Sequence, residues 1–138
     1  MIIIDQTKLL QLEILKEQGQ QMAQQKAQIS AQLQEIELSK NTLNDIKNAK
    51  ENTKIMIPLG AGMYFKGKLT STDSIITLSE GGVAVIKTPK EADELLDERA
   101  GSMKELDARI DAELEKIDKE SAKILKELEA AHAKESSK

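Results

Sequence analysis

The sequence has almost no aromatic side chains and no cysteine. Tyr64 and Phe65 are its only aromatic residues, so the bulky side chains that usually fill a globular core are nearly absent. Without cysteine there is no disulfide scaffold, no thiolate zinc site and no cysteine nucleophile. These absences argue against a compact globule and against redox or thiol-dependent functions.

Long apolar runs and a strongly basic segment are also missing. No stretch approaches the length of a membrane-spanning helix. Met1 is followed at once by Ile2 to Ile4 and then Asp5, which provides neither the basic nor the long apolar part of a secretory leader. The net charge is −4, and no basic stripe typical of nucleic-acid binding is present. We expect a cytoplasmic protein that binds neither membranes nor nucleic acids.

What the sequence does contain is a composition typical of long helices, with 32% charged residues. From Leu12 to Leu43, steps of three and four alternate in a heptad pattern, which predicts one long coiled-coil helix. Gly19, Lys26 and Lys40 interrupt the apolar residues of this seam. We therefore expect looser packing in the first helix, especially near Gly19.

A second long helix is predicted to begin at Thr88-Pro89. Thr88 suits the capping position, Pro89 the first helical position, and Glu91 is spaced to complete a capping box. Its predicted seam consists of Leu96, Arg99, Met103, Leu106, Ile110, Leu114, Ile117, Ser121, Ile124, Leu128 and Ala131. Two successive steps of four around Ile110 predict a stutter, where the supercoil locally unwinds.

The two helices match in length, which favours antiparallel pairing of one against the other. The seams match well if Leu33 faces Ile110 and Leu15 faces Leu128. In this predicted register Lys26 meets Ile117, and the half of the pair near the chain ends is the weaker half.

The segment between the helices has a different period. Four short β-branched or apolar runs, separated by turn residues such as Gly60-Ala61-Gly62 and Glu80-Gly81-Gly82, predict four strands in two hairpins. Two hairpins alone cannot bury both faces or pair all their edges. We expect this region to assemble with other subunits. Three domains are predicted. Residues 1–53 are expected to form one coiled-coil helix, residues 54–88 the oligomerisation region, and residues 89–138 a second coiled-coil helix.

The run Ile57-Pro58-Leu59-Gly60-Ala61-Gly62 resembles the segment that enters the first hairpin in the prefoldin family. Together with Gly81-Gly82-Val83-Ala84-Val85 and the helix start from Glu91 to Leu96, it is similar to the α class of that family. The resemblance covers nearly the whole chain, and is specific in the strands and generic in the helices. The fold it implies is α+β, an antiparallel coiled coil whose two β-hairpins join an intersubunit β-barrel.

The resemblance also implies partners and an activity. Two α-type and four β-type prefoldin subunits form the family's hexamer, whose helical tips hold non-native polypeptides for a group II chaperonin without ATP. Some α-like archaeal subunits instead form filaments, and this alternative stays open. A third alternative, an unrelated coiled-coil tether, predicts one specific helical partner. The hairpin residues expected to mediate assembly are Ile55, Ile57, Pro58, Leu59, Tyr64, Phe65, Ile76, Leu78, Val83 and Val85.

The helix ends carry more apolar residues than one helix pair can bury, which predicts a binding surface at the tips. Mobile tips with exposed apolar side chains suit varied unfolded segments. The alternative is a frayed end or a contact with another subunit. The predicted client-binding residues are Ile2, Ile3, Ile4, Leu9, Leu10, Ile14, Leu125 and Leu128.

The sequence does not predict catalysis. His132 is the only histidine and has no acidic cluster at ligand spacing, so we expect a solvated helix-end residue and no metal site. The glycine pairs lack the Lys-Ser/Thr ending of a phosphate loop and are interpreted as turns. No catalytic residue and no cofactor is expected.

Overall fold

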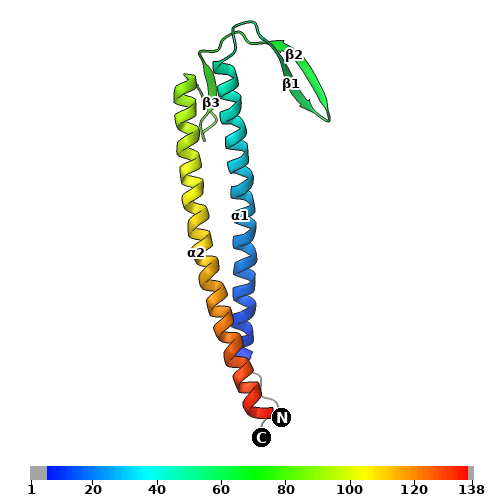
Figure 1. The fold of residues 1–138 in the computed structure, drawn as a ribbon, viewed down its shortest axis with the longest axis vertical. Coiled ribbons are helices and arrows are strands. Elements are labelled where there is room, and N and C mark those ends of the chain that lie inside the picture. Colours follow the sequence, from blue (N-terminus) through cyan, green and yellow to red (C-terminus); the bar gives the residue numbers. More distant parts are fainter. Residues whose placement is uncertain (1–5, 137–138) are drawn as a thin grey trace. The chain divides into compact units, whose positions relative to one another are not determined.

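A computed structural model describes residues 6–136 as two long helices with two β-hairpins between them (Figure 1). Helix α1 spans Gln6–Lys47 and helix α2 spans Pro89–Ser136. The strands are β1 (Lys54–Gly60), β2 (Met63–Lys68), β3 (Ile75–Leu78) and β4 (Ala84–Lys87). This α+β arrangement is the fold class that the sequence predicts.

The chain divides into two compact units, to which both helices contribute. The terminal unit consists of the helical residues up to Gln32 and from Met103 onward. The hairpin unit consists of Leu33–Ser102 and includes all four strands. In each unit, taken by itself, α1 and α2 lie side by side and run in opposite directions (Figure 1).

Burial along α1 follows the predicted heptad seam. Ile29 and Leu43 are buried, and the other seam positions from Leu12 to Lys40, including Gly19, are half-buried, while the positions between them are exposed except for half-buried Ser39. Thr42, by contrast, is exposed and its hydroxyl donates a hydrogen bond to the Leu38 carbonyl oxygen one turn earlier. The seam of the first helix is therefore confirmed.

The start of α2 is a reciprocal capping box, as predicted. The Glu91 N–H donates to the Thr88 hydroxyl oxygen at 3.1 Å, and the Thr88 N–H donates to a Glu91 carboxylate oxygen at 3.3 Å. The backbone hydrogen bond from the Thr88 N–H lowers the pKa of the Glu91 carboxyl, because it stabilises the charged form. Pro89 is the first helical residue, where its missing N–H leaves no bond unmade.

The predicted seam of α2 is wrong at three positions: Ala131 is exposed, and two other seam positions lie one residue further along the helix than predicted. Arg99 and Leu106 are exposed, whereas Ala100 and Asp107 are half-buried in their place. With these residues the steps along α2 alternate regularly between four and three, so the predicted stutter around Ile110 is absent from the described helix. Leu106 was predicted on the seam because it is apolar; in the structure the neighbouring Asp107 lies there instead, where it contacts Lys26.

The predicted register is wrong by one heptad. In the terminal unit Ile117 faces Gly19, with 3.8 Å between its Cγ2 atom and the position of a Cβ on the glycine. It does not face Lys26, seven residues further along α1, whose Nζ lies 3.1 Å from Asp107 and 2.7 Å from Asp111. A heptad seam matches equally well after a shift of seven residues, so apolar periodicity could not distinguish these registers.

The strands form two separate antiparallel hairpins within residues 6–136. Strand β1 pairs with β2 from Lys54–Lys68 to Gly60–Met63, with an irregularity between Pro58 and Gly60. The turn between these strands has positive φ at three successive residues, Gly60 (98°), Ala61 (52°) and Gly62 (77°), and this is why two glycines are needed there. Strand β3 pairs with β4 from Ile75–Lys87 to Leu78–Ala84. The predicted strands are confirmed.

The helices of the described chain do not carry an apolar stretch long enough to cross a membrane.

Candidate functional site: the groove of the terminal unit

Packing in the terminal unit becomes weaker toward its chain ends. Ile29, Ile110 and Ile117 are buried between the helices. Beyond them, the seam residues Leu15 and Ile124 are only half-buried. Small or polar residues at other seam positions remove further apolar contact, because Gly19 has no side chain and Ser121 carries a hydroxyl.

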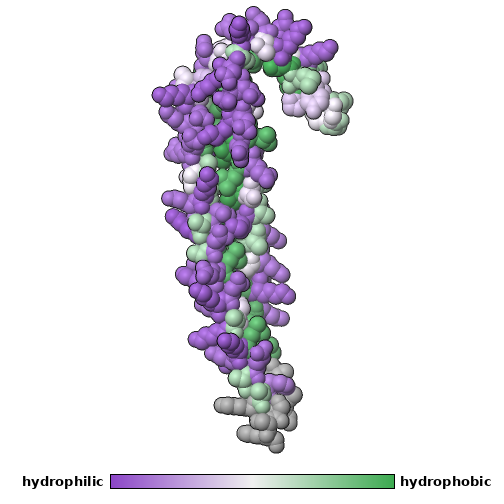
Figure 2. Space-filling view, in the orientation of Figure 1, coloured by the Kyte–Doolittle hydropathy of each residue, from purple (hydrophilic) through white to green (hydrophobic). Residues whose placement is uncertain are grey.

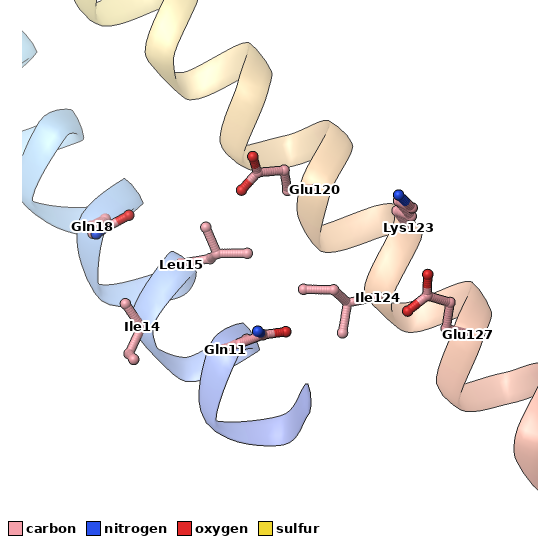
Figure 3. Close-up of a pocket in the computed structure, with 8 residues that line it drawn as sticks. All are labelled: Gln11, Ile14, Leu15, Gln18, Glu120, Lys123, Ile124 and Glu127. Atoms are coloured by element: carbon pink, nitrogen blue, oxygen red, sulfur yellow. The ribbon is translucent and has the colours of Figure 1, made fainter. Parts of the chain in front are cut away.

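A groove of about 430 Å³ lies between the helices in this weakly packed part. Leu15 of α1 and Ile124 of α2 point toward each other and form its apolar floor (Figure 3). The residues lining the groove are Gln11, Ile14, Leu15 and Gln18 from α1, and Glu120, Lys123, Ile124 and Glu127 from α2. A second groove of about 510 Å³ lies beside Gly19, where the missing side chain leaves space next to Ile117.

The rim of the first groove is polar and carries charges of both signs. A salt bridge joins the Lys8 ammonium to the Glu127 carboxylate at 3.2 Å. Gln11 and Gln18 present amide groups that both donate and accept hydrogen bonds. An apolar floor with amides at the rim suits an extended peptide, because side chains can enter the groove while backbone groups find hydrogen-bond partners.

The predicted tip residues occupy two kinds of position. Leu9, Leu10, Ile14 and Leu125 are exposed, with Leu10 at 57% of its maximal accessible surface. Leu128 is half-buried on the seam of α2. Ile14 also lines the groove. Ile2, Ile3 and Ile4 lie outside the described residues.

Sequence reasoning missed the polar half of the groove. The glutamine-rich stretch from Gln18 to Gln34 is interpreted from the sequence as a solvated face whose glutamines can also contact client backbone, and no role is predicted for Gln11, Glu120 or Lys123. Their spacing could have identified the two glutamines. Gln11 lies four residues before Leu15 and Gln18 three residues after it, so both share a helical face with this floor residue.

The residues predicted to mediate assembly lie on the hairpins, largely exposed. Ile57, Leu59, Tyr64 and Phe65 are exposed on the first hairpin, and Ile76, Leu78, Val83 and Val85 on or beside the second, with Ile76 at 71% of its maximal surface. Ile55 is half-buried and Pro58 exposed. Figure 2 shows apolar side chains at the surface of the β1–β2 hairpin. A single hairpin cannot bury such residues on both of its faces.

The hairpin unit contains a further groove that the sequence did not predict. It has a volume of about 410 Å³ and lies where β3 meets the two helices. Ile75 and Thr77 of β3, Leu38 and Ile46 of α1, and Leu95 of α2 are among its lining residues. Half-burial of Ile75 and Thr77 shows that this face of β3 packs on the helices, whereas Ile76 points to the opposite face.

The described residues include no group of three or more His, Cys, Asp or Glu side chains that could hold a metal ion. His132 lies exposed on α2.

Two helices joined by two β-hairpins, with an open groove between the helices and uncovered apolar strands, define a class of coiled-coil binding proteins. The fold is similar to that of a filamentous PFD from Methanocaldococcus jannaschii determined by cryo-electron microscopy, with a TM-score of 0.76 at 12% identity. The match covers 85% of this chain and 97% of that one.

The chain belongs to the prefoldin family, because the family model "Prefoldin subunit" matches residues 15–134. Similar proteins include prefoldin subunit alpha of Methanobrevibacter smithii, 34% identical over 57% of this chain, and prefoldin subunit alpha 1 of Thermococcus kodakarensis, 32% identical over 64%. The matched region spans 53% and 61% of these two relatives. Prefoldin subunit alpha of Pyrococcus horikoshii is 24% identical over 90% of this chain and 84% of that protein. The predicted resemblance to the α class is confirmed.

Proposed function

We propose that this chain is an α-type prefoldin subunit that holds unfolded polypeptides without ATP. The observation that carries the proposal is the open groove of the terminal unit, flanked by exposed Leu10, Ile14 and Leu125. Each exposed apolar side chain contributes on the order of 1–2 kcal/mol when a client covers it, so several together retain a client without one specific contact. Prefoldin is a family of chaperones, not of enzymes, and this supports the proposal.

The hairpins are the proposed assembly region, within residues 54–88 of a chain whose outer segments, 1–53 and 89–138, form the arms. Exposed apolar residues on both hairpins support an intersubunit β-barrel with β-type prefoldin subunits, two α-type to four β-type in the hexamer. Delivery to a group II chaperonin in the cytoplasm completes the proposal. Filament formation is the second candidate, favoured by the fold similarity to a filamentous PFD.

The tip hypothesis predicts that replacing Leu10, Ile14 and Leu125 by Ser reduces client capture by about fivefold or more, because the apolar area available to the client is lost. Capture is measured as suppression of light scattering by denatured citrate synthase diluted into buffer with the assembled complex. The control replaces Leu106 by Ser, since this leucine is also exposed but lies outside the groove of the terminal unit. Equal capture by the tip variant and the control, in assemblies of equal mass, contradicts the tip assignment.

A further inference from the structure

Two lysines occupy seam positions of α1, and each meets a pair of aspartates on α2. In the terminal unit the Lys26 ammonium binds Asp107 at 3.1 Å and Asp111 at 2.7 Å. In the hairpin unit Lys40 binds Asp97, with Asp93 at 3.8 Å. We call these two clusters the lysine clamps.

The two lysine clamps have the same spacing of residues along α1 and α2. Lys26 and Lys40 are two heptads apart on α1, and the aspartate pairs, each spaced by four residues, are two heptads apart on α2. Hydrogen bonds that the ammonium groups donate to the aspartates, chiefly to Asp111 from Lys26 and to Asp97 from Lys40, raise the pKa of both lysines. The carboxylates therefore stabilise the charged form of both lysines.

We propose that Lys26 and Lys40 are positioning residues that select the register of the two helices. The apolar seam repeats every seven residues, so shifting α2 by one heptad keeps it facing α1. The pairing of two carboxylates with each lysine does not survive that shift: Lys26 keeps one carboxylate and Lys40 keeps none. In the register predicted from the apolar pattern, Leu114 and Asp118 take the places of Asp107 and Asp111 opposite Lys26.

The second clamp loses more in the same shifted register. There the positions of Asp93 and Asp97 are taken by Ala100 and Lys104, so that Lys40 loses both carboxylates and meets a like charge. A shift in the opposite direction places Ala100 and Lys104 opposite Lys26 instead. The observed register is the one among the three in which both seam lysines meet paired carboxylates.

Register determines which residues face each other in the terminal unit. A shift of one heptad moves one helix along the other by about 10 Å. In the predicted register Ala131 takes the place of Ile124 opposite the α1 residues that line the groove, and Gly19 is separated from Ile117. The lysine clamps thus determine the composition of the groove, and this inference holds whether or not the groove binds unfolded chains.

Disulfide trapping tests the proposal directly, because the chain has no cysteine of its own. The pair Gly19→Cys with Ile117→Cys reports the observed register, since a Cβ atom at residue 19 would lie 3.8 Å from the Cγ2 atom of Ile117. The pair Gly19→Cys with Ile124→Cys reports the register shifted by one heptad. Each pair is oxidised in the full chain, and the cross-linked monomer is measured on a non-reducing gel.

In the native background we expect the 19–117 pair to cross-link at least about tenfold more than the 19–124 pair. Replacing Lys26 and Lys40 by Leu should raise the 19–124 cross-link by about fivefold or more, because Leu is accepted opposite apolar residues in either register. Lys26→Gln with Lys40→Gln should act in the same direction, and circular dichroism verifies that each variant is helical. The matched control, Lys116→Leu with Lys119→Leu, removes two exposed lysines whose carboxylate partners lie on their own helix.

An unchanged preference for the 19–117 pair in both clamp variants overturns the proposal. That result would mean that the connecting hairpins determine the register, since they join the end of α1 at Lys47 to the start of α2 at Pro89. A shift that also occurs in the Lys116/Lys119 control overturns it as well, since any loss of charge then suffices.

Discussion

The boundary of α2 depends on a few side chains at Thr88-Pro89-Lys90-Glu91. Thr88 and Glu91 each accept a backbone N–H that the first turn of a helix would otherwise leave unpaired. The pattern was readable in the sequence because a capping box is local and needs no partner from elsewhere in the fold. Residues whose role depends on the facing helix, such as Asp107, carry no such signal.

The cap makes a prediction for Thr88. Thr88→Ala should lower the free energy of unfolding by about 1 kcal/mol, because the Glu91 N–H loses its acceptor. The change is measured by urea unfolding followed by circular dichroism. Ser at the same position retains the hydroxyl and should restore most of the loss; a Ser variant as unstable as the Ala variant contradicts the capping role.

The carboxylate of the cap makes a separate prediction of pH dependence. Because folding lowers the pKa of Glu91, its stabilising effect is fully present above the unfolded-state pKa of about 4.3 and is lost as the pH falls through the lower folded pKa. Glu91→Ala should therefore lower the thermal midpoint at pH 7 and have a smaller effect at pH 3. Glu94→Ala, at an exposed position of the same helix, is the control. An equal effect of Glu91→Ala at both pH values excludes the charge contribution.

At the scale of elements, each helix has an apolar stripe, yet the stripe alone does not identify the facing residues. Leu106 continues the apolar pattern but is 45% exposed, while Asp107 takes the seam opposite Lys26. A polar pair at such positions trades apolar contact for a defined register. Helix existence, length, period and antiparallel pairing were therefore predictable, but the register between α1 and α2 was not.

The corrected seam predicts different sensitivities at neighbouring positions. Ile110→Ala should destabilise the chain by about 2–4 kcal/mol, because it leaves a cavity between the helices where Ile110 is 5% exposed. Leu106→Ala should cost less than about 1 kcal/mol, as expected for a surface substitution. Urea unfolding of both variants compares them directly. An equal loss of unfolding free energy in both variants would contradict the corrected seam and support the predicted one, in which Leu106 lies between the helices.

At the scale of the whole molecule, the hairpins present more apolar surface than one chain can bury. Ile76, Phe65 and Val83 are exposed although they lie on or beside strands, and two-stranded sheets of this size are marginally stable alone. The physical inference is that the native state of these strands includes other subunits.

Mass measurement separates the two proposed assemblies. Light scattering after size exclusion should give one hexamer-sized peak when the chain is mixed with a β-type prefoldin subunit. Large, concentration-dependent assemblies of the chain alone support the filament alternative instead. In either assembly, Phe65→Ser with Ile76→Ser should lower the mass while helical content is retained, because both residues are exposed on the hairpins. An unchanged mass contradicts assembly through the strands.

The sequence by itself determined the elements of this protein, because their signals are local: the heptad period of α1, the capping box before α2 and the turn residues between the strands. It also carried the family resemblance and the exposed apolar residues Leu9, Leu10 and Ile14. Only the tertiary structure decided that Asp107, not Leu106, lies on the seam, that the register differs by one heptad, and that Gln11 and Glu120 share a groove. The reason is physical. A repeating apolar pattern is unchanged by a shift of seven residues. Among the three registers compared, only the observed one places paired aspartates opposite both Lys26 and Lys40.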